Sequence, residues 1–97
     1  MKISDIQSAF EGAYKQDPRD GLSVTPKAGT GEFTVVVRHT DADGTLRGFD
    51  VVAQPTDAEE KTAGQVGQDV AEVVERELGY GQLPAAGEDG AFKRIVV

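Results

Sequence analysis

Residues 31–55 read GEFTVVVRHTDADGTLRGFDVVAQP and form the most regular part of this 97-residue chain. Apolar residues alternate with other residues on both sides of the Asp41–Gly44 turn, and this period of two is typical of half-buried strands. The turn itself is rich in aspartate and glycine, which favour tight reversals of the chain. We therefore predict a β-hairpin, with the rest of the chain built to cover one of its faces.

The length of the hairpin loop decides which side chains share a face. A two-residue loop would set Arg38 opposite Arg47, which is unfavourable. A three-residue loop of residues 42–44 places six apolar residues on one face, in the pairs Val37 with Phe49, Val35 with Val51, and Phe33 with Ala53. A slip of one residue turns a whole strand over, so we choose the three-residue loop. Gly44 then adopts the left-handed conformation that such loops require.

A helix and a strand are predicted before the hairpin. Residues 4–16 carry an apolar stripe at helical spacing, and Ser4 with Gln7 forms a capping box at the start. Residues 22–27 form a short strand after a turn rich in aspartate, proline and glycine. Pro26 has no N–H, so this strand lies at an edge of the sheet or ends there.

A second, longer helix is predicted over residues 57–78. Thr56 with Glu59 forms its capping box, and Gly79 is a natural cap at its end. An interior glycine costs about 1 kcal/mol relative to alanine. Gly67 therefore indicates either a close approach of the helix to the sheet or a kink in the helix.

Residues 91–97 form a last strand, in which the alternation leaves both faces open as the inward one. The predicted order is α-β-β-β-α-β, and both helices need one apolar face to cover. We predict one α+β domain over residues 1–97, a two-layer sandwich of an antiparallel sheet with both helices on one face. The residues expected to be buried are Phe10, Val35, Val37, Phe49, Val51, Val66, Val70 and Val73.

The composition of the chain excludes some classes of function. The net charge of −7 argues against direct nucleic-acid binding, which needs clustered lysine and arginine. The chain has no cysteine, which suits a reducing compartment, and no apolar run long enough to cross a bilayer, and we expect it to have no signal peptide. We expect a cytoplasmic protein that does not contact membranes.

Three local patterns suggest chemistry, and none of them is complete. His39 is the only histidine, and no nucleophile lies near it in the sequence. The Asp41–Gly44 turn begins like a calcium loop, but position 52 is valine where that loop needs glutamate. The Gly29–Gly31 segment precedes a strand, whereas a phosphate loop precedes a helix. We predict no enzyme activity, no cofactor and no metal site.

Two surfaces remain as candidates for binding a partner. The outer face of the hairpin carries Val36, Leu46 and Val52, which are either scattered surface residues or a contact surface that could also close a homodimer. The second helix carries most of the negative charge, which either keeps the protein soluble or docks on a basic partner. Its outward acidic residues are Asp69, Glu72 and Glu75.

These features favour a small non-enzymatic protein that binds another protein. In size, acidity and lack of catalytic residues, the chain is similar to stoichiometric inhibitors such as phage anti-CRISPR proteins and toxin-immunity proteins. This similarity implies a basic or nucleic-acid-handling protein as the partner. In acidity and element order it also resembles type III secretion chaperones, which implies a chaperone or adaptor as the alternative. The double-stranded RNA-binding domain shares the order α-β-β-β-α, but acidic residues replace its lysine cluster here.

Overall fold

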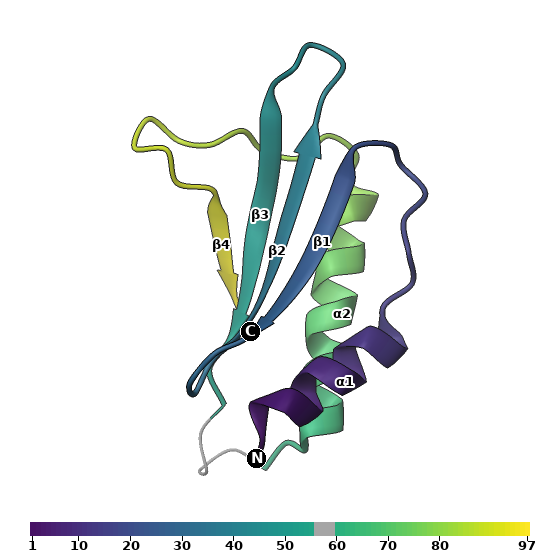
Figure 1. Cartoon of the computed structure of the whole chain (residues 1–97), viewed down its shortest axis with the longest axis vertical. Coiled ribbons are helices and arrows are strands. Elements are labelled where there is room, and N and C mark those ends of the chain that lie inside the picture. The colour runs from purple at the N-terminus through teal and green to yellow at the C-terminus, as the bar shows by residue number, and fades with distance from the viewer. Residues whose placement is uncertain (56–59) are drawn as a thin grey trace.

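The computed structural model describes residues 1–55 and 60–97, and it has the predicted α-β-β-β-α-β order (Figure 1). The four strands form one sheet in the order β1-β2-β3-β4, and both helices pack on the same face of it. The fold is therefore the predicted α+β two-layer sandwich. The bounds of its elements are α1 Ile3–Ala13, β1 Leu22–Ala28, β2 Phe33–Thr40, β3 Leu46–Ala53, α2 Ala63–Gly79 and β4 Lys93–Val96.

The hairpin register confirms the prediction of a three-residue loop. Val37 pairs with Phe49 and Val35 with Val51, and all four side chains are buried. The Asp41 N–H donates to the Thr45 carbonyl oxygen over 2.9 Å and closes the loop. Gly44 has a φ of +84°, the left-handed conformation expected of it. The hydrophobic pattern thus fixes both the loop length and the buried face.

The sheet is mixed, so the prediction that it is antiparallel throughout is wrong for one strand pair. β1, β2 and β3 are antiparallel, but β4 runs parallel to β3. α2 carries the chain back to the end of the sheet where β3 begins, as Figure 1 shows. A strand that follows such a crossover enters in the same direction as the strand before it.

The first helix starts and ends earlier than predicted. It spans Ile3–Ala13, where residues 4–16 were expected, and Lys2 stands at its N-cap position without a side-chain cap. Ile3 packs against the core, so the helix includes it and Ser4 lies inside the first turn. Tyr14 leaves the helix with extended backbone angles (φ −71°, ψ 128°), and its ring stacks on Phe10.

The second helix also differs from its predicted bounds. It begins at Ala63 and its capping box is formed by Thr62 and Gln65, which exchange hydrogen bonds of 3.2 and 2.9 Å. The predicted box of Thr56 with Glu59 lies outside the described residues, and residues 60–62, which the prediction of a helix over 57–78 included, are not helical. At the other end, Gly79 is still helical, and Gly81 takes the left-handed conformation.

The core lies between the sheet and the two helices. All the residues predicted to be buried are buried except Val73, which is half-buried. Of the two alternatives predicted for Gly67, the structure shows a close approach, but the helix approaches α1 at this residue and not the sheet. A Cβ at this position would lie 2.6 Å from the Ala9 Cβ and 2.7 Å from the Ile6 carbonyl oxygen. The glycine therefore lets the two helices cross in contact.

The last strand turns Lys93 and Ile95 toward the helices and Arg94 and Val96 outward. Its register sets Lys93 beside Phe49 and Ile95 beside Val51, both of which face the core. The Lys93 ammonium group lies 2.8 Å from the Glu77 carboxylate of α2. The structure thus decides between the two orientations that the sequence leaves open.

Candidate functional site

The face of the sheet opposite the helices has no helix over it within the described part of the chain (Figure 1). Strand pairing places every second residue of each strand on this outer face. Threonine, serine, lysine and arginine side chains make up much of it, with a few valines between them. Its members are Ser23, Thr25, Lys27, Thr34, Val36, Arg38, Thr40, Leu46, Gly48, Asp50, Val52, Arg94 and Val96.

The three apolar residues predicted for this face all lie on it, but they do not form one patch. Val36 lies opposite Asp50 and is a diagonal neighbour of Val52. Val52 is only 2% exposed, because it sits on an inner strand between Thr34 and Val96. Leu46 is 49% exposed and lies opposite Thr40 at the far end of the hairpin.

Val96 is the accessible apolar residue that the sequence analysis did not assign to this face. It is 59% exposed and pairs with Val52. The alternation in residues 91–97 is compatible with either orientation, so its place depends on the parallel register with β3. The half-buried Val36 and the exposed Val96 therefore both lie beside the buried Val52.

Arg38 forms the centre of the outer face. One of its terminal nitrogens, Nη1, lies 2.8 Å from the Asp50 carboxylate, 2.8 Å from the Val37 carbonyl oxygen and 3.2 Å from the Phe49 carbonyl oxygen. Its guanidinium group also lies 3.9 Å from the centre of the Phe92 ring, a cation–π contact. This side chain ties β2 to the segment that leads into β4.

Gly48 makes this crossing possible. A Cβ on Gly48 would lie 2.0 Å from the Val37 carbonyl oxygen and 3.1 Å from Arg38 Cδ. Any side chain at this position would therefore displace the neighbouring strand or the arginine. Without a side chain on Gly48, Arg38 can lie flat across β3 and reach Phe92.

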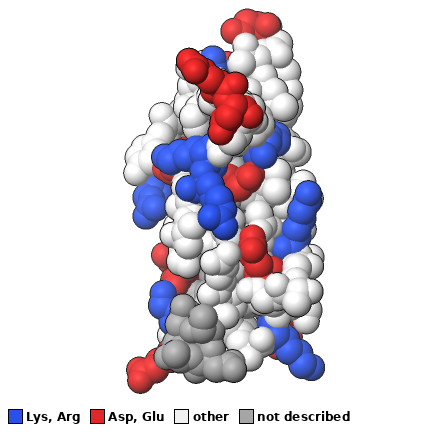
Figure 2. Space-filling model, turned by 90° about the vertical axis from the view of Figure 1, so that its left-hand side faces the viewer, with Lys and Arg blue, Asp and Glu red and all other residues white. Residues whose placement is uncertain are grey.

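The outer face has the opposite charge from the chain as a whole. The charged residues at the outer-face positions of the strands are Lys27, Arg38 and Arg94 against the single acid Asp50. The net charge of this face is +2, whereas that of the whole chain is −7. The remainder of the chain therefore carries −9. Figure 2 shows the β4 side of the molecule, where lysine and arginine side chains gather at mid-height with acidic groups around them.

The acidic side chains of α2 are partly occupied by contacts within the chain. Asp69 lies 2.8 Å from the Lys61 ammonium group, and Glu75 accepts a hydrogen bond from the Lys15 backbone N–H over 2.9 Å. Glu72 is exposed. Glu77, which also contributes to the predicted acidic charge, is 9% exposed and paired with Lys93. Of the three residues predicted to bind a partner here, Glu72 is the most accessible.

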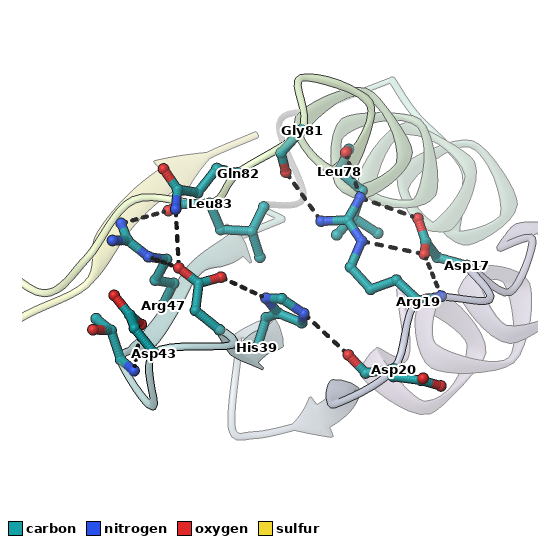
Figure 3. A network of polar contacts seen from close by, with 12 residues as sticks. Asp17, Arg19, Asp20, His39, Asp43, Arg47, Leu78, Gly81, Gln82 and Leu83 are labelled. Carbon is teal, nitrogen blue, oxygen red and sulfur yellow. Dashed lines mark hydrogen bonds and ion pairs between the residues drawn. The ribbon is translucent and has the colours of Figure 1, made fainter.

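A polar network joins three loops at the end of the sheet where the β2–β3 hairpin turns (Figure 3). His39 Nε2 donates to the Asp20 carbonyl oxygen over 3.0 Å, and Nδ1 lies 3.4 Å from the Asp41 carboxylate. The same carboxylate is bonded to the Arg47 guanidinium group, and it accepts from the Gln82 side chain over 2.9 Å. Both nitrogens of His39 therefore face oxygen atoms of the fold, and the residue holds loops together.

Arg19 caps the C-terminus of α2 in the same region. Its guanidinium group donates to the carbonyl oxygens of Leu78 over 2.8 Å and Gly81 over 3.0 Å (Figure 3). The Leu78 carbonyl belongs to the last turn of α2, at the negative end of the helix dipole, where a cation is favourable. Asp17 lies 3.4 Å from Arg19 Nε and holds the guanidinium group in place.

The acidic residues of the turn between β2 and β3 also form contacts within the chain. The Thr45 backbone N–H lies 3.0 Å from Asp43 Oδ1 and holds the pKa of this carboxyl below its ordinary value of 3.8.

Among residues 1–55 and 60–97, no three His, Cys, Asp or Glu side chains are grouped in a way that could hold a metal ion. Over the same residues, no helix has the length and apolar character needed to cross a membrane.

Comparisons with known proteins find no match for the chain. No family model matches it, no curated protein matches it, and no solved structure matches it. A functional assignment therefore depends on the surfaces described above.

Proposed function

We propose that this is a non-enzymatic protein that binds another protein and acts on it stoichiometrically, as an inhibitor of the anti-defence or toxin-immunity kind. One observation carries the proposal: one whole face of the sheet is left without a helix over it in the described chain. Antiparallel sheets commonly pack one face on the core and leave the other face in water, where a partner can reach it. The absence of cysteine suits a reducing compartment, so we place this binding in the cytoplasm.

The composition of the outer face supports a role in protein binding. Val36 and the exposed Val96 supply apolar area beside hydroxyl groups and the fixed guanidinium of Arg38. Protein interfaces combine apolar area with arginine and hydrogen-bonding groups in this way. The side chains most reminiscent of catalysis, His39 and Asp41, are engaged in joining loops.

The charge of the rest of the chain supports a partner that is basic overall, such as a nucleic-acid-handling protein. With the outer face at +2, the remaining surface attracts positive charge at long range and speeds the first encounter. Glu72 is the exposed acid of α2, with Asp69 beside it on the same helix. We propose that this surface steers the partner and that the outer face makes the lasting contact.

Affinity purification from the native host tests this function. The wild-type protein, Val36→Asp, and the double variant Asp69→Lys with Glu72→Lys are each used as bait after circular dichroism confirms that they are folded. We expect the wild type to retain one protein in equimolar amount, Val36→Asp to lose it, and the double variant to retain less of it. Capture of the same protein by all three in equal amounts would contradict the proposal. Sedimentation at micromolar concentration tests whether the outer face closes a homodimer instead.

A further inference from the structure

The outer edge of β4 has free backbone groups that point away from the sheet. β4 is the last strand in the sheet order, and no described segment runs along its far side (Figure 1). The Val97 N–H donates to the Val52 carbonyl oxygen, so odd-numbered residues of this segment face β3. Because the direction of the N–H and C=O groups alternates along a strand, those of Arg94 and Val96 face outward.

The two edges of the sheet differ in their protection against another strand. β1, at the opposite edge, contains Pro26, which has no N–H, followed by the exposed Lys27. Both features discourage pairing with a further strand. β4 has neither proline nor a bulge in its ladder with β3. The sheet is therefore open to extension at one edge only.

The side chains around the open edge supply a surface for an added strand. On the outer face Val96 is 59% exposed, and Val97 beyond it is 41% exposed. On the helix side, Ile95 is half-buried against the core. A groove of about 380 Å³ adjoins Lys93 there, and its lining includes Phe49, Tyr80 and Leu83. An extended segment beside β4 would have apolar contacts on both faces.

The charge of the edge is basic. Lys93 is paired with Glu77, and Arg38 is paired with Asp50. Arg94 is exposed and makes no ion pair or hydrogen bond with any residue that the structure describes. In the view onto this edge in Figure 2, lysine and arginine side chains lie in the middle of the surface, with acidic groups around them. The favourable neighbour for Arg94 in an added strand is a carboxylate.

We propose that the β4 edge binds an extended strand of the partner protein, which continues the sheet and presents an acidic side chain to Arg94 and apolar side chains to Val96 and Ile95. This inference rests on the proposed function and names the form and chemistry of the segment that is bound. Strand addition of this kind obtains affinity from backbone hydrogen bonds and specificity from alternate side chains. A partner that is basic overall can carry such a strand, because long-range attraction depends on summed charge and contact depends on the nearest groups.

A second copy of the chain fits this edge less well. Antiparallel pairing of two β4 strands brings Arg94 of each copy close to Arg94 of the other. With Ile95 opposite Ile95, the two arginines are diagonal neighbours, and like charges at such positions are unfavourable. The charge of the edge therefore selects an acidic strand over its own copy.

Short peptides test the proposal directly. One peptide, the valine–glutamate peptide, has a single glutamate between valines, so that the glutamate can face Arg94 while valines face Val96 and Ile95. Its counterpart, the valine–lysine peptide, has lysine in place of that glutamate. Each is added to the full-length protein labelled with ¹⁵N, and binding is followed by the backbone amide signals. We expect the valine–glutamate peptide to shift the amides of Arg94 and Val96, with Thr25 of β1 unaffected. The valine–lysine peptide should not bind.

Two matched variants separate backbone pairing from side-chain contact. Val96→Pro removes the outward N–H but leaves the β3–β4 hydrogen bonds in place, whereas Val96→Thr keeps both the N–H and the side-chain shape. Loss of one hydrogen bond should weaken binding of the valine–glutamate peptide by about two- to tenfold in the proline variant relative to the threonine variant. Arg94→Glu should reverse the preference between the two peptides. The amide spectrum of β2 and β3 shows whether each variant is folded.

The proposal is overturned if the wild type binds both peptides equally or binds neither. It is also overturned if Val96→Pro and Val96→Thr bind alike, or if the protein self-associates through β4 in sedimentation and excludes the peptide. The proposed function is tested separately by partner capture. A partner that is retained equally by wild type and Val96→Pro would leave that function standing and remove the β4 edge from it.

Discussion

Gly67 of α2 and Ala9 of α1 lie so close that a Cβ on Gly67 would be 2.6 Å from the Ala9 Cβ. The same Cβ would lie 2.7 Å from the Phe10 backbone nitrogen, so the obstacle includes backbone that does not move independently. The contact between the two helices therefore depends on the absence of one methyl group. This relationship gives the first prediction.

Gly67→Ala should destabilise the protein although alanine is the better helix former. Overpacking a helix contact costs about 1–3 kcal/mol, which exceeds the gain of about 1 kcal/mol in helix propensity. Gly12→Ala in α1 is the matched control, because nothing lies within 4 Å of its Cβ position. The control should gain about 0.5–1 kcal/mol. Urea unfolding measures both, and a stabilised Gly67→Ala variant would show that the helices do not touch here.

Gly44→Val should weaken the hairpin. Gly44 has a φ of +84°, and a β-branched residue resists that conformation. The free energy of unfolding should fall by more than about 1 kcal/mol. Ala42→Val, in the same exposed loop, should have little effect. Thermal unfolding of the two variants gives the comparison, and equal midpoints would contradict the left-handed turn.

Val70→Asp should prevent folding. Val70 has no exposed surface and packs in the core between α2 and the sheet. Burial of an unpaired carboxylate costs several kcal/mol, comparable with the total stability of about 5 kcal/mol expected for so small a domain. Gln68→Asp, two residues away on the exposed side, adds the same charge to the same helix. Circular dichroism should show a folded control and an unfolded Val70→Asp.

Tyr14 should make stability fall in alkaline solution. Burial raises the pKa of the Tyr14 phenol above its ordinary value of 10.0, and the charges of Asp17 and Glu75 act in the same direction. A group whose pKa is raised by folding keeps its stabilising effect below the unfolded-state pKa and loses it as the pH rises through the folded-state pKa. Between about pH 10 and 12, the wild type should therefore lose more stability than Tyr14→Phe.

Denaturant unfolding at several pH values between 9 and 12 measures this difference. Tyr80→Phe is the control, because Tyr80 is 72% exposed. Its pH dependence should match that of the wild type. If Tyr14→Phe and the wild type lose stability in parallel, the phenol is not partly buried as the structure shows.

The two proposed binding surfaces should differ in their response to salt once the partner is known. Val36→Asp removes apolar contact on the outer face, so it should raise the dissociation rate with little dependence on salt. Asp69→Lys with Glu72→Lys removes steering charge, so it should slow association and weaken its salt dependence. Surface plasmon resonance at two ionic strengths measures both rates. Unchanged rates for both variants would exclude both surfaces.

The sequence by itself determined the element order, the hairpin and most of the core. The alternation in residues 33–37 and 49–53 strongly favours one hairpin register, because a slip of one residue would turn the buried valines of the slipped strand to the other face. Helical periodicity placed Phe10, Val66 and Val70 on inward faces, and each is buried. Patterns of this kind involve only residues that are near one another in the chain, so they can be recognised in the sequence alone.

Helix boundaries were less well determined because two capping boxes compete before α2. Thr56 with Glu59 and Thr62 with Gln65 have the same local pattern, and the structure uses the second. The close approach of Gly67 to Ala9 selects where α2 crosses α1, and this contact joins residues far apart in the chain. The sequence does not distinguish the two capping-box patterns, and packing of α2 on α1 favours one start of the helix.

The binding surfaces depended most on the tertiary structure. Val52 belongs to the outer face by alternation but is buried, because β4 pairs beside it and places Val96 against it. The direction of β4 follows from the path of α2 across the sheet, which no local pattern in residues 91–97 records. The acids of α2 read as one charged face, yet Asp69 and Glu75 are engaged by Lys61 and Lys15. Exposure and free charge are properties of neighbours in space, so only the folded chain decides them.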